Sequence, residues 1–226
     1  AGPKARQLMQ KVSTDDFSNE NFKWLTAQDV NIGYAPVNAM RVNFVGELGW
    51  ELHHPIEMQN YIFDQVMEAG VEFDIKPFGI RAMDSMRLEK SYRLIPREMS
   101  IEYSAYESGL DRFVRLDKEN DFIGKEALKD WQERGASNGF VTMEVLGVAD
   151  ADARGSEAIY KDGEVVGRAT SGGFGWRCGK SLALGLVRKD LTAIGTELEI
   201  EILGEKYKSV VIDESPFDPS NECLRS

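Results

Sequence analysis

Two carboxylates stand close together in the stretch "NFVGELGWELHH", residues 43–54. Glu47 and Glu51 lie in a run that otherwise resembles a β-strand, although acidic residues and glycine are poor strand formers. The simplest explanation is that both glutamates are exposed strand residues. Because a carboxylate can also accept two side-by-side N–H donors, the same run is a candidate ligand contact.

A second stretch reverses the charge of the chain. Between residues 76 and 97, six basic side chains accompany two acidic ones, so the segment is locally +4. In an acidic protein such a reversal can hold an anionic small molecule, but an amphipathic helix showing its solvated face is the commoner cause. The basic residues are Lys76, Arg81, Arg87, Lys90, Arg93 and Arg97.

Two apparent motifs do not fit their usual chemistry. The stretch "SGGFGWRCGKSLALG" ends in Gly-Lys-Ser like a phosphate-binding loop, but Phe174 stands where that loop needs its first glycine, and a strand-like run follows. His53 and His54 are adjacent, so on a strand they would face opposite ways and could not share a metal. We therefore expect neither a nucleotide site nor a metal site.

Helical patterns dominate the residues before Gly135. Residues 2–12, 58–70, 78–90 and 124–135 have helical spacing or helix-ending signals. The second segment places Met58, Tyr61, Ile62 and Val66 on one face and ends at Gly70, and the third places Ile80, Met83 and Leu88 together.

A half-buried strand is predicted between the first two of these helices. Met40, Val42 and Phe44 alternate with polar Arg41 and Asn43, which is the period of a strand with one buried face. We expect this strand to continue through the stretch that carries Glu47 and Glu51.

From residue 136 the pattern changes to short β-rich runs separated by turn residues. Asp162-Gly163 is a strong hairpin signal, and Gly204-Glu205 joins two further alternating runs. This half should be an antiparallel barrel or sandwich. We predict an α+β chain with a first domain over residues 1–135 and a C-terminal antiparallel β-barrel domain over residues 136–226.

Composition limits the function classes. Apolar residues make up 42% and charged residues 29%, as in ordinary soluble globular proteins. The net charge of −11 would repel a nucleic-acid backbone, and no apolar run approaches the roughly 20 residues of a membrane span. We therefore expect neither nucleic acid nor a membrane as a partner. Cys178 and Cys223 lie far apart, which favours buried or idle thiols over a disulfide.

Several stretches together resemble the folate-binding aminomethyltransferase family, typified by the glycine cleavage T-protein. They are "VGELGWEL", "GIRAMDSMRLEKSYR", "YESGLDRFVRLDKENDFIGKEAL", "ATSGGFGWRCGKSLALGLVR" and "ESPFDPSN", in the family's order over nearly the whole chain. "LEKSYR", "ESGLDRFVRLDK" and "DFIGKEAL" are most similar to the C-terminal folate portion of flavin-dependent dimethylglycine and sarcosine dehydrogenases.

The resemblance gives Glu51 a role. In the family's Gly-Glu-x-Gly-x-Glu pattern the second glutamate holds the pterin ring of tetrahydrofolate, whose edge presents two N–H donors that one carboxylate can accept. Glu47 would shape the surrounding strand. Phe44 stands where the family usually has a tyrosine in the pocket, and Leu52 and His53 would continue the pocket wall.

Two arginines depart from the family's pattern. Arg112 falls where relatives often carry Trp or Tyr beside the pterin, and a guanidinium can still stack on such a ring. Arg81 lies two residues before Met83, the position at which the T-protein has its arginine. We treat Arg81 as a candidate ligand for the glutamate tail of folate and a surface ion pair as its alternative role.

The resemblance also implies missing parts. Relatives begin well over a hundred residues earlier, and that part carries the aspartate thought to assist one-carbon transfer, so no catalytic residue is assigned here. No Gly-x-Gly-x-x-Gly opens a βαβ unit, so FAD is expected only in an absent N-terminal domain. We expect a fragment, or one piece of a larger enzyme, that is inactive alone.

The resulting hypothesis is a tetrahydrofolate-dependent module that captures a one-carbon unit, donated by a methylated amine, as methylenetetrahydrofolate. In the branch of flavin-dependent dehydrogenases the resemblance implies that flavin first oxidises an N-methyl group. The alternatives are a stand-alone T-protein-like transferase or demethylase, and a non-catalytic folate-binding relative. The expected compartment is the cytoplasm of a bacterium or the mitochondrial matrix of a eukaryote.

Overall fold

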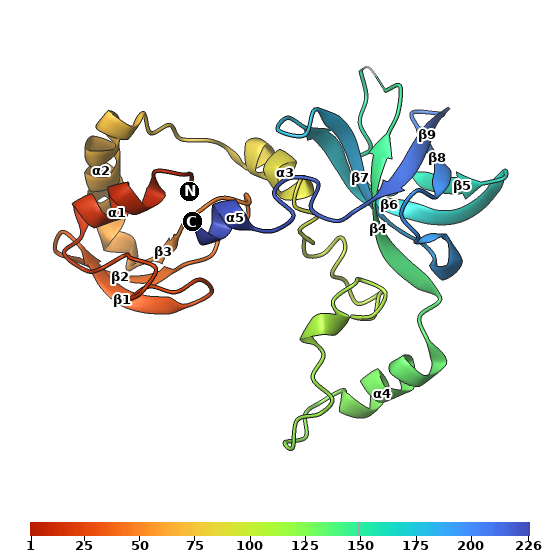
Figure 1. The fold of residues 1–226 in the computed structure, drawn as a ribbon, viewed down its shortest axis with the longest axis horizontal. Coiled ribbons are helices and arrows are strands. Elements are labelled where there is room, and N and C mark those ends of the chain that lie inside the picture. The colour runs from red at the N-terminus through yellow and green to blue at the C-terminus, as the bar shows by residue number, and fades with distance from the viewer. Residues whose placement is uncertain (149) are drawn as a thin grey trace. The chain divides into compact units, whose positions relative to one another are not determined.

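The computed structural model describes residues 1–148 and 150–226. The chain divides into two compact units, one formed by residues 1–87 together with 218–226 and the other by residues 88–217. The chain therefore leaves the first unit and returns to it, and Figure 1 marks both of its ends in that unit. The last long helix ends at Arg134, and the first barrel strand begins at Asn138. The domain boundary predicted between residues 135 and 136 stays a prediction.

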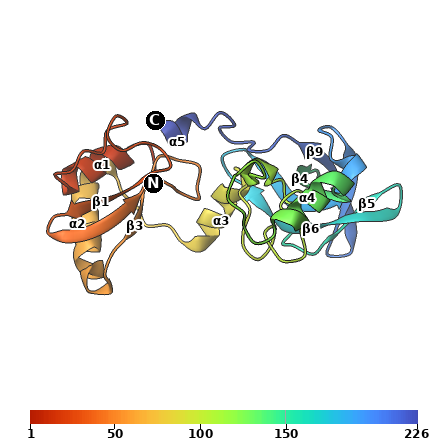
Figure 2. The same cartoon turned by 90° about the horizontal axis from the view of Figure 1, so that it is seen from below.

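The first unit is a three-stranded antiparallel sheet packed against two helices (Figures 1 and 2). The sheet order is β1-β2-β3, so β2 lies in the middle. Alternate residues of β1 and β2 are buried, and they join the apolar faces of α1 and α2 in one core cluster. The elements are α1 (Ala5–Val12), β1 (Ala27–Ile32), β2 (Ala35–Met40), β3 (Glu51–His53), η1 (Ile56–Met58), α2 (Gln59–Gly70), η2 (Val71–Phe73) and α3 (Ile80–Leu88).

The helix predicted over residues 58–70 is confirmed as α2. Ile62 is buried, and Met58, Tyr61 and Val66 pack against the same cluster, as their spacing predicts. α2 ends at Gly70, as predicted, and the short 3-10 helix η2 follows it directly. The helical conformation then ends at Asp74, which is left-handed at φ 58°.

The apolar face predicted for α3 is only partly correct. Leu88 is buried, but the Ile80 side chain is 75% exposed at the helix start. The spacing of Ile80, Met83 and Leu88 is helical, but helical spacing alone does not show whether every turn has a packing partner.

The strand predicted through residues 41–50 is wrong. β2 ends at Met40, residues 41–50 form an irregular loop, and only residues 51–53 return to the sheet as β3. The alternation misled because Arg41 is buried, whereas Val42 and Phe44 are only partly buried. Gly46, at φ 75°, adopts a left-handed conformation that breaks a strand and that glycine tolerates best.

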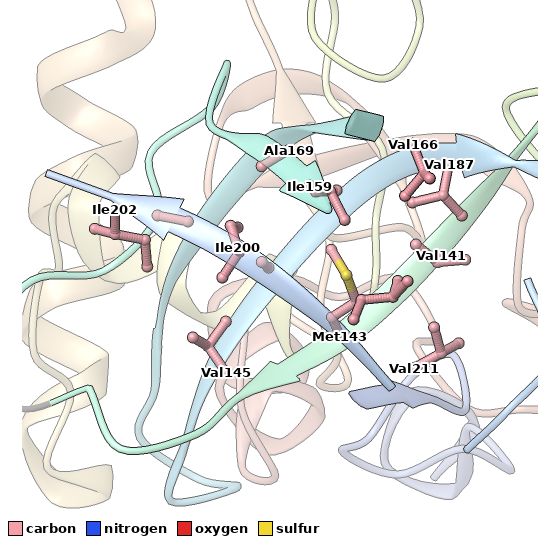
Figure 3. Packing of buried hydrophobic residues seen from close by; sticks show 13 residues of the cluster. Val141, Met143, Val145, Ile159, Val166, Ala169, Val187, Ile200, Ile202 and Val211 are labelled. Atoms are coloured by element: carbon pink, nitrogen blue, oxygen red, sulfur yellow. The ribbon is translucent and has the colours of Figure 1, made fainter. Parts of the chain in front are cut away.

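The second unit contains the predicted barrel. Its six antiparallel strands close in the order β4-β7-β6-β5-β8-β9, which confirms a barrel rather than a sandwich. Side chains from all six strands fill the interior, with Met143, Ile159 and Ile200 fully buried (Figure 3). The strands are β4 (Asn138–Val145), β5 (Ala158–Lys161), β6 (Glu164–Gly175), β7 (Lys180–Arg188), β8 (Glu197–Ile202) and β9 (Glu205–Ile212).

The hairpin signals are confirmed with one shift. Asp162 and Gly163 both have positive φ and join β5 to β6. Between β8 and β9 the two turn residues are Leu203 and Gly204, one residue earlier than predicted, because Ile202 pairs with Glu205. Lys180 and Ser181 begin β7, so the Gly-Lys-Ser sequence opens a strand and not the helix of a phosphate-binding loop.

Of the remaining elements of the described residues, three lie in the second unit and α5 lies in the first. They are η3 (Asp111–Phe113), α4 (Lys125–Arg134), η4 (Lys189–Leu191) and α5 (Glu222–Arg225). α4 ends at Gly135, as predicted. Cys178 and Cys223 are both partly buried free thiols. In the described residues no helix has the length and apolar character needed to cross a bilayer.

The basic segment is solvated only in part, because Lys76, Arg81 and Arg97 are exposed whereas the other three basic residues are not. Arg87, Lys90 and Arg93 are buried, and their charges are satisfied within the fold. Arg87 Nε donates to Asp84 at 2.7 Å, and Lys90 Nζ donates to the carbonyl of Phe217 at 3.0 Å. An opposite-charge partner or a main-chain carbonyl compensates the burial of each cation, which sequence periodicity could not indicate.

Candidate functional site

Glu51 begins β3, and its carboxylate is available to solvent. The Glu51 side chain is 52% exposed, and Glu51 pairs with Met40 of the central strand. His53 lies two residues further on the same face, with its Nε2 3.6 Å from Glu51 Oε2. The sheet thus presents an accessible acceptor pair beside an imidazole.

Leu52 points to the other face of β3. It is partly buried and packs against the apolar cluster of the first unit. It also lines a hollow of about 540 Å³ together with Trp50 and Val66. Strand alternation therefore separates Leu52 from Glu51 and His53, and its side chain supports the strand from behind.

A shallow hollow lies on the exposed face of the sheet. It measures about 410 Å³, and His53 lines it together with polar residues of β1 and β2. Asn38, which pairs with His53, donates from its Nδ2 to Asp29 Oδ1 at 2.8 Å within this wall. The volume falls in the range of small-molecule sites. The lining residues are Asp29, Val30, Asn31, Pro36, Val37, Asn38, His53, His54 and Pro55.

The loop before β3 is organised by Asn43. Asn43 Oδ1 accepts hydrogen bonds from the amides of Val45 and Gly46, each at 2.9 Å, and from the amide of Glu47 at 3.4 Å. Its Nδ2 donates to the carbonyl of Glu47. One side chain thus binds several main-chain groups of a loop that lies outside the sheet. Sequence reasoning treated Asn43 only as a polar strand position.

Phe44 and Glu47 belong to this ordered loop. Both are partly buried, and they precede Glu51 by seven and four residues. All five residues predicted in this stretch, Phe44, Glu47, Glu51, Leu52 and His53, belong to the first unit, and Leu52 faces away from Glu51 and His53.

The two predicted arginines are not part of this group. Arg81 is exposed in the first turn of α3. Arg112 belongs to the second unit, in η3, where its guanidinium lies 4.9 Å from the ring centroid of Phe113. Their assignment to folate stays a prediction.

The fold and these positions define a class of protein: a helix-and-sheet unit bearing the Gly-Glu-x-Gly-x-Glu loop, joined to a closed six-stranded antiparallel barrel. Residues 1–118 match the model of the GCVT N-terminal domain, and residues 139–218 match the glycine cleavage T-protein C-terminal barrel domain. The chain belongs to the glycine cleavage T-protein family.

Relatives with different names share this region. The chain is 41% identical to the human mitochondrial dimethylglycine dehydrogenase over 95% of its own length and 25% of that protein. It is 34% identical to an aminomethyltransferase of Bacillus cytotoxicus over 96% of its own length and 58% of that protein. It therefore spans about a quarter of the first relative and somewhat more than half of the second.

A solved structure has the same fold. The glycine cleavage system aminomethyltransferase T from Bartonella henselae superposes with a TM-score of 0.82 over 95% of this chain and 57% of that one. The sequence identity is 20%, so this comparison supports the architecture alone.

Proposed function

We propose that the first unit binds tetrahydrofolate and that the Glu51 carboxylate accepts the two N–H donors on the edge of its pterin ring. The observation that carries this proposal is the position of Glu51: an accessible carboxylate on an edge strand, 3.6 Å from His53, which itself lines the hollow of about 410 Å³. The two acceptor oxygens of Glu51 fit the ligand, because a carboxylate can accept hydrogen bonds from two adjacent N–H groups.

The other residues of the stretch would support this contact. The Asn43-ordered loop fixes the approach to β3, and Phe44 offers a partly buried ring close to it in sequence. Leu52 anchors β3 from the opposite face. Bound tetrahydrofolate supplies the nitrogen atoms that take up a one-carbon unit, and the task of this chain is to hold and orient it.

We further propose that the captured unit comes from a methylated amine and that the chain is the C-terminal part of an enzyme related to dimethylglycine and sarcosine dehydrogenases. Identities of 41% and 34% to proteins of those names over nearly the whole chain support this assignment. Holding the acceptor near the released unit replaces a bimolecular encounter by a local one, which is worth up to ~7–11 kcal/mol for ideally oriented groups. Flavin is assigned to no residue of this chain.

The aminomethyltransferase relatives support an alternative, a T-protein-like transferase that works without flavin. Product analysis with the intact enzyme separates the two. Tetrahydrofolate-dependent formation of methylenetetrahydrofolate from dimethylglycine or sarcosine favours the dehydrogenase assignment. Transfer from an aminomethyl donor alone favours the transferase.

The pterin contact is tested by calorimetric titration of the chain with tetrahydrofolate under anaerobic conditions. Glu51→Gln keeps the size of the side chain but turns half of the acceptor into a donor. We expect it to weaken binding about 10- to 100-fold, the usual range for hydrogen bonds to a charged group. Glu68→Gln, at an exposed position of α2, is the matched control. Equal affinity of wild type and Glu51→Gln would reject the assignment.

A further inference from the structure

Arg41 is a buried cation whose role nothing in the sequence pattern indicates. It follows the last residue of β2 and is 2% exposed. Its Nη1 donates to the carbonyl of Phe22 at 2.7 Å, and its Nη2 lies 3.3 and 3.2 Å from the carbonyls of Arg225 and Ser226. All three acceptors are main-chain oxygens. Burial lowers the pKa of Arg41, and the nearby charge of Arg6 lowers it further.

A second arginine converges on the same carbonyl. Arg6 Nη2 donates to the carbonyl of Ser226 at 2.5 Å. The Arg6 and Arg41 guanidinium carbons lie 5.6 and 5.9 Å from the centroid of the Trp50 ring. Two arginines that both lie over the Trp50 ring therefore donate to the end of a segment that lies far from them in sequence.

That segment, residues 218–226, is here called the strap. It belongs to the first unit, contains α5, and buries Leu224 to 5% exposure. Its Arg225 guanidinium lies 4.7 Å from the ring centroid of Trp24. The strap supplies two of the three carbonyls that solvate Arg41, so its loss would leave a buried guanidinium short of acceptors.

Arg41 and Trp50 are also the two ends of the loop that leads to the site. The main chain of Arg41 is fixed on both sides: its amide donates to Thr26 at 2.9 Å, and its carbonyl accepts from Leu25 at 3.3 Å. Trp50 directly precedes Glu51 and packs edge-on against Phe17. Because Arg41 and Trp50 directly flank the loop, a displacement of either residue would also move the adjacent end of the loop.

We propose that Arg41 is a positioning residue for Glu51, and that it acts by fixing both ends of the loop of residues 42–49 when the strap is docked. Its effect on the ligand rests on the proposed tetrahydrofolate function. Its effect on the loop does not, and this separates the two claims experimentally.

The experiment measures hydrogen exchange of the full chain, with no ligand, for Arg41→Met and for Leu224→Ser. Arg41→Met keeps the length of the side chain without its donors, and Leu224→Ser releases the strap while leaving Arg41 intact. Both should speed exchange of the Val45 and Gly46 amides about tenfold or more, while β1 and β2 keep their protection. The matched controls are Arg188→Met and Leu203→Ser, exposed barrel positions that should leave the loop unchanged.

Tetrahydrofolate affinity is then measured on the same proteins. Arg41→Met and Leu224→Ser should both bind tetrahydrofolate about three- to tenfold more weakly, and Arg41→Lys, which keeps the charge and one donor direction, should fall between Arg41→Met and wild type. A faster loop with unchanged affinity would overturn the positioning role, as would an unchanged loop. If Arg41→Met exposes the whole unit to exchange, Leu224→Ser decides alone. If Glu51→Gln binds tetrahydrofolate as tightly as wild type, the proposed function is rejected instead.

Discussion

The Arg93 guanidinium donates two hydrogen bonds to the Glu214 carboxylate, from Nη1 to Oε2 at 2.7 Å and from Nη2 to Oε1 at 3.0 Å. The Arg93 side chain is 7% exposed and that of Glu214 is 46% exposed, and the guanidinium also stacks 3.7 Å from the centroid of Phe140. This contact ties the segment after α3 to the segment that follows β9.

Removing the carboxylate should therefore destabilise the barrel unit. Glu214→Ala leaves Arg93 with only main-chain acceptors, and we expect a loss of about 1–3 kcal/mol in the free energy of unfolding. Because Glu214 is partly exposed, this loss of stability should be smaller than for a fully buried ion pair. Urea unfolding measures the free energy of unfolding of both proteins. Asp190→Ala breaks an exposed pair with Arg188 and should leave the urea unfolding midpoint nearly unchanged, so equal losses in the two variants would contradict the assignment.

The barrel strands pack too closely at Gly167 to admit a side chain. A Cβ there would lie 2.2 Å from the carbonyl oxygen of Leu186 and 2.8 Å from the Cα of Val187. Because both neighbours are backbone of the adjacent strand, Gly167→Ala should lower the free energy of unfolding, measured by thermal melts, by about 1–3 kcal/mol. Gly79→Ala meets no atom within 4 Å and should be neutral or slightly stabilising in the same thermal melts.

The loop before Glu51 should depend on one amide side chain. Asn43→Ala removes an acceptor shared by three backbone amides, and we expect faster exchange of the Val45 and Gly46 amides and weaker tetrahydrofolate binding by about tenfold. Asn38→Ala, on the exposed face of β2, serves as the control for exchange. Undiminished loop protection in Asn43→Ala would show that the loop is held by other contacts.

Asp117 offers a test of local electrostatics. The Arg115 guanidinium donates to its carboxylate and lowers the pKa of Asp117 from 3.8 to about 2. The resulting stabilisation is present above the ordinary pKa and is lost as pH falls through about 2. Arg115→Gln should return the pKa toward 3.8 in a carboxyl NMR titration. Asp190, paired with Arg188, should keep its lowered pKa, and a simultaneous shift of both would point to a global change.

Elements whose sequence shows a regular hydrophobic period or clear turn residues were predicted correctly. The face of α2 was predictable because helical periodicity marks burial, and the barrel because short β-rich runs were separated by turn residues such as Asp162-Gly163. The loop of residues 41–50 was not predictable in this way. Its alternating residues imitate a strand, whereas Asn43 and Gly46 bend the chain through hydrogen bonds and dihedral angles that hydrophobicity does not record.

The candidate site was predicted only in part for a related reason. The family pattern pointed to Glu51, whose role stays a prediction, and strand alternation places Leu52 on the opposite face from His53. Arg41 escaped notice because two of its acceptors come from residues 225 and 226. Trp50 escaped notice because its ring packs against Phe17 and Phe22, which lie well before it in the sequence. Likewise, Lys90 and Arg93 are basic in the sequence, but their burial depends on distant acceptors at Phe217 and Glu214.

The return of residues 218–226 to the first unit has a consequence for the order of synthesis. A ribosome that adds ~5–20 residues per second completes every barrel strand before it makes α5. The barrel can thus collapse on the nascent polypeptide while Arg41 still lacks the carbonyls of Arg225 and Ser226. The sheet of the first unit is thus translated before the barrel but completed by residues translated after it, so substitutions within residues 218–226 should perturb that sheet before they perturb the barrel.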